Sequence, residues 1–166
     1  QNIRPYTQDI PASIFVGLDF NVGQMSASVF VDQKTHIHQI DEIALSSSNT
    51  HEVADEIQHR YPNRKIFVYP DPAGSARKTS ADAGVTDHTI LANRGFVIKA
   101  PRAHTPVRDG INAVNSMLRN AAGDVRYYVD PRCRKSIESL EKHSYKAGTS
   151  VPDKDSGFDH FSDSIR

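Results

Sequence analysis

The chain has 166 residues, of which 37% are apolar and 24% are charged, a composition that suits one globular domain with its own core. Its formal net charge is zero, which argues weakly against binding nucleic acid through bulk positive charge. There is no long apolar run and only one cysteine, Cys133, so the sequence excludes a transmembrane helix and an internal disulfide, and suits a reducing compartment.

The first third of the chain predicts an antiparallel meander. Residues 1–13 contain two prolines and little periodicity, so we expect an arm or linker before a domain that spans residues 14–166. Residues 14–21 read as a strand that is buried on both faces, residues 24–31 alternate between apolar and polar, and residues 36–45 fit a third strand. Short turns join the three segments, so neighbouring strands should be antiparallel.

After residue 45, helical patterns alternate with short strands. In the third predicted helix, Thr105 is expected to cap the N-terminus and Pro106 to take the first helical position. The order predicts one mixed sheet with helices on its faces, an α/β fold. The predicted helices lie in 46–62, 86–95, 103–123, 132–143 and a segment from Phe158. The predicted strands lie in 64–74, where the strand ends at a Pro/Gly turn, and in 96–101 and 125–131.

Three acidic residues lie where element ends would place them together. Asp19 lies near the end of the first strand, Asp71 lies at the end of the fourth in "VYPDPAG", and Asp163 lies on the last helix. Ligands bind at strand ends in open sheets, so Asp19 and Asp71 would meet if their strands are neighbours. Clustered carboxylates repel each other unless a hard divalent cation neutralises them. The pattern therefore indicates metal-dependent phosphoryl chemistry, in which two ions assist attack and leaving.

A plainer interpretation competes for each acid. An aspartate at a strand end is usually a turn or cap residue, and "DPAG" around Asp71 is an ordinary turn. Asp19 resists that interpretation because apolar neighbours surround it and burying an unpaired charge is costly. Asp130, in "VDPRC", could join the cluster, although a cap before the next helix is the simpler role.

Histidines are further candidates for a metal site. His160 and Asp163 share a helix face because they are three residues apart, as Asp159 and Asp163 do at four, so His160 could ligate or orient a metal-bound water. His36 and His38 alternate on a strand and could form a metal pair, although we expect them to be polar residues that face solvent.

Five segments in order resemble the nuclease domain of the large terminase subunit of tailed double-stranded DNA bacteriophages. They are "VGLDFN", "VYPDPAG", "DGINAVNSML", "YYVDPRCRKSIESLEKHSYK" and "GFDHFSDSIR". The resemblance covers nearly the whole chain. It implies an RNase H-like fold: a mixed central sheet whose first three strands are antiparallel, flanked by helices.

The resemblance also implies a function and a set of residues. It implies an endonuclease that cuts concatemeric viral double-stranded DNA during genome packaging, with two Mg²⁺ or Mn²⁺ ions bound by Asp19, Asp71 and Asp163 and with His160 beside them. DNA phosphates could be contacted by six basic residues: Arg77, Lys78, Lys99, Arg102, Arg108 and Lys146.

The resemblance implies a larger assembly as well. The partners would be double-stranded DNA and, in the full-length protein, the small terminase subunit and the portal, with no membrane contact. The protein would act in the host cell cytoplasm and would not be a virion component. The sequence lacks an initiator methionine and ends inside a helical pattern, so we expect a C-terminal fragment without the ATPase domain.

Two other functions remain open. Another RNase H-like enzyme, such as a Holliday-junction resolvase, a transposase core or an RNase H, would use the same acids. A DNA-binding or portal-docking module with a degenerate site would not use them for catalysis.

Overall fold

The computed structural model describes residues 1–20, 23–71, 84–100 and 106–142. In these ranges a six-stranded mixed sheet has the strand order β5-β4-β1-β2-β3-β6. Strands β1, β2 and β3 are antiparallel, while β4 lies parallel to β1, and β6 lies parallel to β3. The strands are β1 Ser13–Asp19, β2 Gln24–Asp32, β3 Ile37–Ser46, β4 Lys65–Pro70, β5 Val97–Ile98 and β6 Tyr127–Val129. The helices are α1 Thr50–Arg60, α2 Asp87–Asn93, α3 Val107–Leu118 and α4 Arg134–Lys142.

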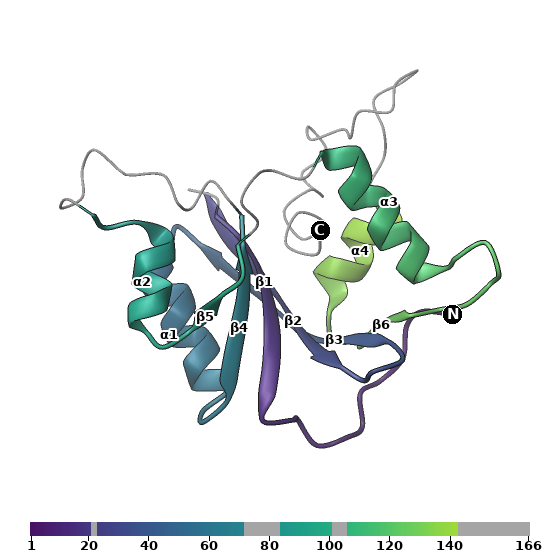
Figure 1. The fold of residues 1–166 in the computed structure, drawn as a ribbon, viewed down its shortest axis with the longest axis horizontal. Helices are drawn as coiled ribbons and strands as arrows, with labels where there is room; N and C mark the ends of the chain where they lie inside the picture. Colours follow the sequence, from purple (N-terminus) through teal and green to yellow (C-terminus); the bar gives the residue numbers. More distant parts are fainter. Residues whose placement is uncertain (21–22, 72–83, 101–105, 143–166) are drawn as a thin grey trace.

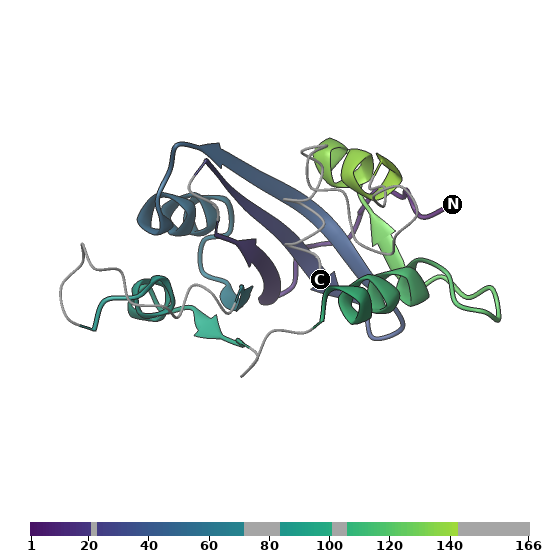
Figure 2. The same cartoon turned by 90° about the horizontal axis from the view of Figure 1, so that it is seen from above.

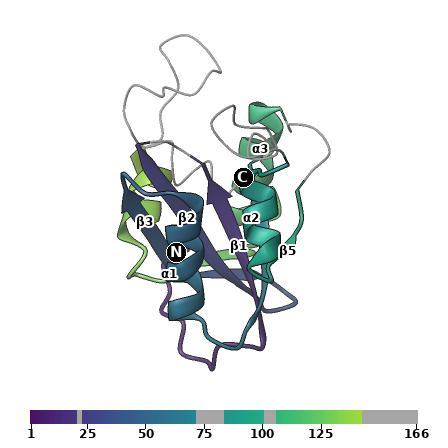
Figure 3. The same cartoon turned by 90° about the vertical axis from the view of Figure 1, so that its left-hand side faces the viewer.

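Helices cover the two faces of the sheet at different places (Figures 1 and 2). Helices α1 and α2 pack on one face, where Val53, Ile57 and Leu91 join the inward side chains of β1, β2 and β4 in the larger core. Figure 3 shows these two helices in front of the strands. Helices α3 and α4 pack on the opposite face, around Tyr127 and Val129 of β6. The predicted mixed sheet with an antiparallel start is confirmed.

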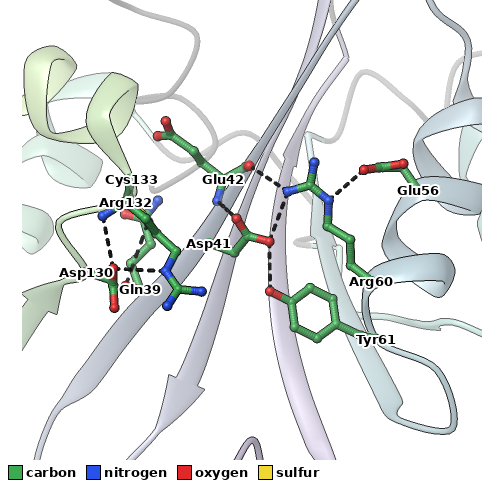
Figure 4. A network of polar contacts seen from close by, with 9 residues as sticks. All are labelled: Gln39, Asp41, Glu42, Glu56, Arg60, Tyr61, Asp130, Arg132 and Cys133. Atoms are coloured by element: carbon green, nitrogen blue, oxygen red, sulfur yellow. Dashed lines mark hydrogen bonds and ion pairs between the residues drawn. The ribbon is translucent and has the colours of Figure 1, made fainter. Parts of the chain in front are cut away.

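Strand β3 connects both helical layers through adjacent acids (Figure 4). A bulge at Ile40 shifts the register of β3 against β2, so the side-chain alternation is interrupted there. As a result Asp41 faces α1, where it accepts hydrogen bonds from Arg60 Nη1 at 3.0 Å and Tyr61 Oη at 2.9 Å. Glu42 faces α4 and accepts from two backbone N–H groups and one hydroxyl in its first turn: Lys135 N, Ser136 N and Ser136 Oγ.

The N-terminal segment extends the sheet beyond β6. Arg4 N–H donates to the carbonyl of Val129 at 2.9 Å, and Val129 N–H donates to the carbonyl of Asn2 at 2.9 Å. The side-chain amide of Asn2 donates to the carbonyls of Leu118 and Tyr127. Part of the predicted arm is therefore held at the sheet edge by backbone pairing, which hydrophobic periodicity does not report.

Three local expectations were wrong. Pro106 is the N-cap of α3 and not its first helical residue, because its backbone angles are not helical and its carbonyl accepts from the N–H of Asp109 and Gly110; Thr105 lies outside the described residues. The strand predicted over 96–101 is reduced to the edge strand β5, which has two residues. His38 does not face solvent: it is 4% exposed, and its Nε2 donates to the carbonyl of Arg4.

Two further observations complete the fold. Cys133 is fully buried beside β6. In the ranges that the structure describes, no helix has both the length and the apolar character needed to cross a bilayer.

Candidate metal centre

Parallel pairing of β1 and β4 brings Asp19 and Asp71 to the same edge of the sheet. Leu18 lies opposite Pro70 in the register, so the next residue of each strand is an aspartate. The Asp71 N–H donates to the carbonyl of Leu18 at 3.0 Å, which continues the ladder to the two acids. The carboxyl ends of parallel strands meet at one edge, and here both end in a carboxylate.

The alternation of side chains points both carboxylates to the same face. Leu18 and Pro70 are buried on the face that α1 and α2 cover. Successive residues in a strand point to opposite faces, so Asp19 lies on the other face, and extending the alternation of β4 by one residue predicts the same face for Asp71. Asp19 is 8% exposed, and it lies opposite Ser26 of β2 in the register. A carboxylate this deeply buried requires compensating partners.

His88 of α2 contacts the strand end that carries Asp71. Its Nε2 lies 3.1 Å from the carbonyl oxygen of Asp71. A carbonyl only accepts hydrogen bonds, so this nitrogen carries the proton and donates it. The imidazole ring also lies 6.1 Å from the ring of Phe20, the residue after Asp19. The His88 side chain thus lies against the ends of both β1 and β4, where the two predicted acids are.

The N-termini of α1 and α2 are joined beside the same edge. Thr50, the first residue of α1, donates its hydroxyl to Oδ1 of Asp87 at 2.7 Å, and both side chains are buried. This bond fixes the start of α2, and His88 is the next residue. No role was predicted for His88 from the sequence. The signal that could have identified it is its place in the first turn of α2, the helix that comes next after β4 among the described elements.

The remaining predicted residues divide into two groups. Asp130 does not join the acids: it lies beside Gln39, with β2 and β3 between it and β1, and it accepts from Arg132 (Figure 4). It also accepts from the N–H of Tyr6. Lys99 is exposed just after β5, and Arg108 is exposed in the first turn of α3. Seven residues lie outside the described ranges: Asp163, His160, Asp159, Arg77, Lys78, Arg102 and Lys146.

The chemistry of the two described acids fits a hard divalent cation. Carboxylate oxygens are the ligands that Mg²⁺ and Mn²⁺ prefer, and two adjacent carboxylates repel each other unless a cation lies between them. Within the ranges that the structure describes, no three His, Cys, Asp or Glu side chains converge on one point. Asp19 and Asp71 would therefore supply part of a metal site.

A family profile identifies the family to which this chain belongs. The profile described as the terminase RNaseH-like domain matches residues 16–166. The chain belongs to this family. None of the curated proteins compared by sequence matches the terminase domain described here.

Solved structures share the fold of this terminase domain at low sequence identity. The large terminase of a thermophilic bacteriophage superimposes with a TM-score of 0.72 at 13% identity, over 99% of this chain and 41% of that protein. The nuclease domain of the phage P22 large terminase gives 0.67 at 16% identity, over 96% and 82%. The large terminase nuclease domain of bacteriophage SPP1, solved with bound Mn, gives 0.52 at 20% identity, over 92% and 85%. The chain thus spans about two fifths of the thermophilic phage terminase.

Proposed function

We propose that this domain is an endonuclease that cuts concatemeric viral double-stranded DNA during genome packaging and depends on Mg²⁺ or Mn²⁺. The observation that carries the proposal is the pair of carboxylates, Asp19 and Asp71, at one edge of the sheet. Membership of the terminase RNaseH-like family supports it, as does the manganese bound by the SPP1 relative.

In this proposal Asp19, Asp71 and Asp163 would hold two ions, with His160 as a further candidate for the same site. When bound, the ions supply an activated water for attack on phosphorus and stabilise the leaving 3′ oxygen. The protein contributes by holding the two acids in position. The last hydrogen bond of the β1–β4 ladder fixes Asp71 against Asp19, and the bond from His88 fixes the main chain of Asp71 from the helical side. Removing bulk water from Asp19 strengthens its attraction for a cation.

Substitution of Asp19 by asparagine tests the proposal. Asp19→Asn keeps the size of the side chain and removes its charge, so cleavage of plasmid DNA with Mn²⁺ should fall by at least about 100-fold. Asp55→Asn is the matched control, because Asp55 is exposed on α1 and pairs only with Arg94 among the described contacts. Folding is checked by thermal unfolding. Undiminished cleavage by Asp19→Asn would remove the basis of the proposal.

The same preparation separates the alternative functions. Linear duplex, a four-way junction and an RNA–DNA hybrid are compared with the same metal. The packaging endonuclease should cut the linear duplex, whereas a resolvase or an RNase H should prefer one of the other substrates. A docking module would bind DNA and leave all three substrates intact.

We also propose that the longer protein works with the small terminase subunit and the portal in the host cytoplasm. Co-purification of the full-length protein with each partner tests this part. Loss of either interaction when this domain is removed would assign that contact to the domain.

A further inference from the structure

Strands β4 and β1 carry an aromatic strip on the face that α1 and α2 do not cover. Along β4, Val68 is buried in the core under these helices, so Lys65, Phe67 and Tyr69 point to the opposite face. Phe15 of β1 lies opposite Phe67 in the register, and the two rings stack with centroids 5.3 Å apart. The Tyr69 ring lies 6.4 Å from that of Phe15.

Two lysines flank this strip. Lys65 Nζ lies 5.1 Å from the centre of the Phe67 ring, and Lys99 Nζ lies 5.9 Å from the same centre. Both lysines are exposed. Of the residues that the structure describes in β1, β4 and β5, none places a carboxylate on this face before the strand ends at Asp19 and Asp71. The face is therefore locally positive in a chain whose net charge is zero.

Tyr69 continues the strip toward the acids. Its side chain is 48% exposed, which is unusual for a large aromatic residue in the middle of a sheet. Tyr69 and Asp71 share one face and are separated by about 7 Å, since a strand rises about 3.3 Å per residue. By the same measure Lys65 lies about 20 Å from Asp71, close to the rise of about 6 base pairs of a DNA duplex.

We propose that Lys65, Lys99 and Tyr69 form a track along β4 that holds the sugar–phosphate backbone of duplex DNA and leads it to Asp19 and Asp71. This proposal rests on the proposed nuclease function, which supplies the reason for a DNA path toward the acids. The lysines bind phosphates, and the tyrosine packs against sugar and donates its hydroxyl to phosphate oxygen. Contacts of this kind position a duplex without reading its sequence. Lys99 was already a candidate from the sequence, whereas Lys65 and Tyr69 were not.

The charge on the track makes salt dependence the sharpest measurement. Binding of a fluorescent 30-base-pair duplex is followed by anisotropy in EDTA, where the proposed hydrolysis does not proceed, at several NaCl concentrations. The binding constant K falls as salt rises, and each lost phosphate contact reduces the steepness of log K against log salt by about 1. Lys65→Gln and Lys99→Gln should each lower it by about 1, and the double variant by about 2. Tyr69→Ala should weaken binding severalfold and leave the slope nearly unchanged.

A control substitution and the cleavage assay separate the outcomes. Arg94→Gln removes one positive charge at the end of α2, on the helix-covered face, and should leave the slope as in the wild type. A double lysine variant with wild-type Tm, slope and affinity overturns the track. If the wild type also cleaves DNA with Mn²⁺, that result leaves the nuclease proposal intact. Conversely, a lowered slope in a domain that never cleaves supports the track and contradicts the nuclease proposal.

Discussion

His88 offers a test of how the second acid is positioned. His88→Ala removes the hydrogen bond from Nε2 to the carbonyl of Asp71, while His88→Gln keeps an N–H donor at a similar reach. A neutral hydrogen bond contributes about 1 kcal/mol net. If the bond acts fully on the metal-bound state, its loss corresponds to about a fivefold rise in the Kd for Mn²⁺, because 1.4 kcal/mol is about tenfold. An outer-shell effect on a ligand can be larger, about 10- to 100-fold.

Isothermal titration calorimetry with Mn²⁺ measures this effect without any cleavage. The expected order of affinity is wild type, then His88→Gln, then His88→Ala. Thermal unfolding without metal accompanies each titration, because the same bond also joins α2 to the end of β4 and its loss should cost about 1 kcal/mol of folding free energy. Folded His88→Ala that binds Mn²⁺ within twofold of the wild type would refute the positioning role, and so would a glutamine variant as weak as the alanine variant.

Three further predictions concern stability and access. Glu42→Gln should destabilise the fold by about 2 kcal/mol, because the carboxylate accepts three hydrogen bonds at the start of α4; urea unfolding should show a lower midpoint with an unchanged m-value. Burial lowers the pKa of His38, despite the opposing bond to the carbonyl of Arg4 and the charge of Asp130. The unfolded chain therefore takes up the proton first, so the free energy of unfolding should fall as pH drops through about 6.5 and level off below the lowered folded-state pKa. His38→Gln should flatten this dependence, and an equal slope in both proteins would contradict it. Burial also raises the pKa of the Cys133 thiol, so it should react with a disulfide reagent only after unfolding; rapid reaction of the native protein would contradict this.

The sequence predicted the antiparallel start of the sheet because it depends on local patterns, whereas it placed Asp19 and Asp71 together only on the condition that their strands are neighbours. Short turns between the first three strands leave little choice but an antiparallel meander. Helix α1 lies between β3 and β4 in the chain and crosses back over the sheet. Strand β4 therefore pairs with the free edge of β1, to which it runs parallel. Once these strands are neighbours, the position of Asp19 and Asp71 at their ends follows from counting residues.

The features that the sequence did not reveal depend on contacts between distant segments. Hydrophobic periodicity reports which face of an element is buried, but not which backbone group a polar side chain will reach. The bond from His88 to Asp71 crosses 17 residues, and the bonds from Asn2 to the α3–β6 region cross more than 100. Periodicity also does not reveal the bulge at Ile40, which inverts the side-chain alternation and so decides that Asp41 rather than Glu42 faces α1.

That bulge has a consequence for the motions of the domain. Because Asp41 holds α1 and Glu42 holds α4, neither helix layer can separate from β3 without breaking charged hydrogen bonds. The central amides of β3 should consequently exchange their hydrogens only when the whole domain opens, while the two-residue strand β5, at the far edge, should exchange through local fraying.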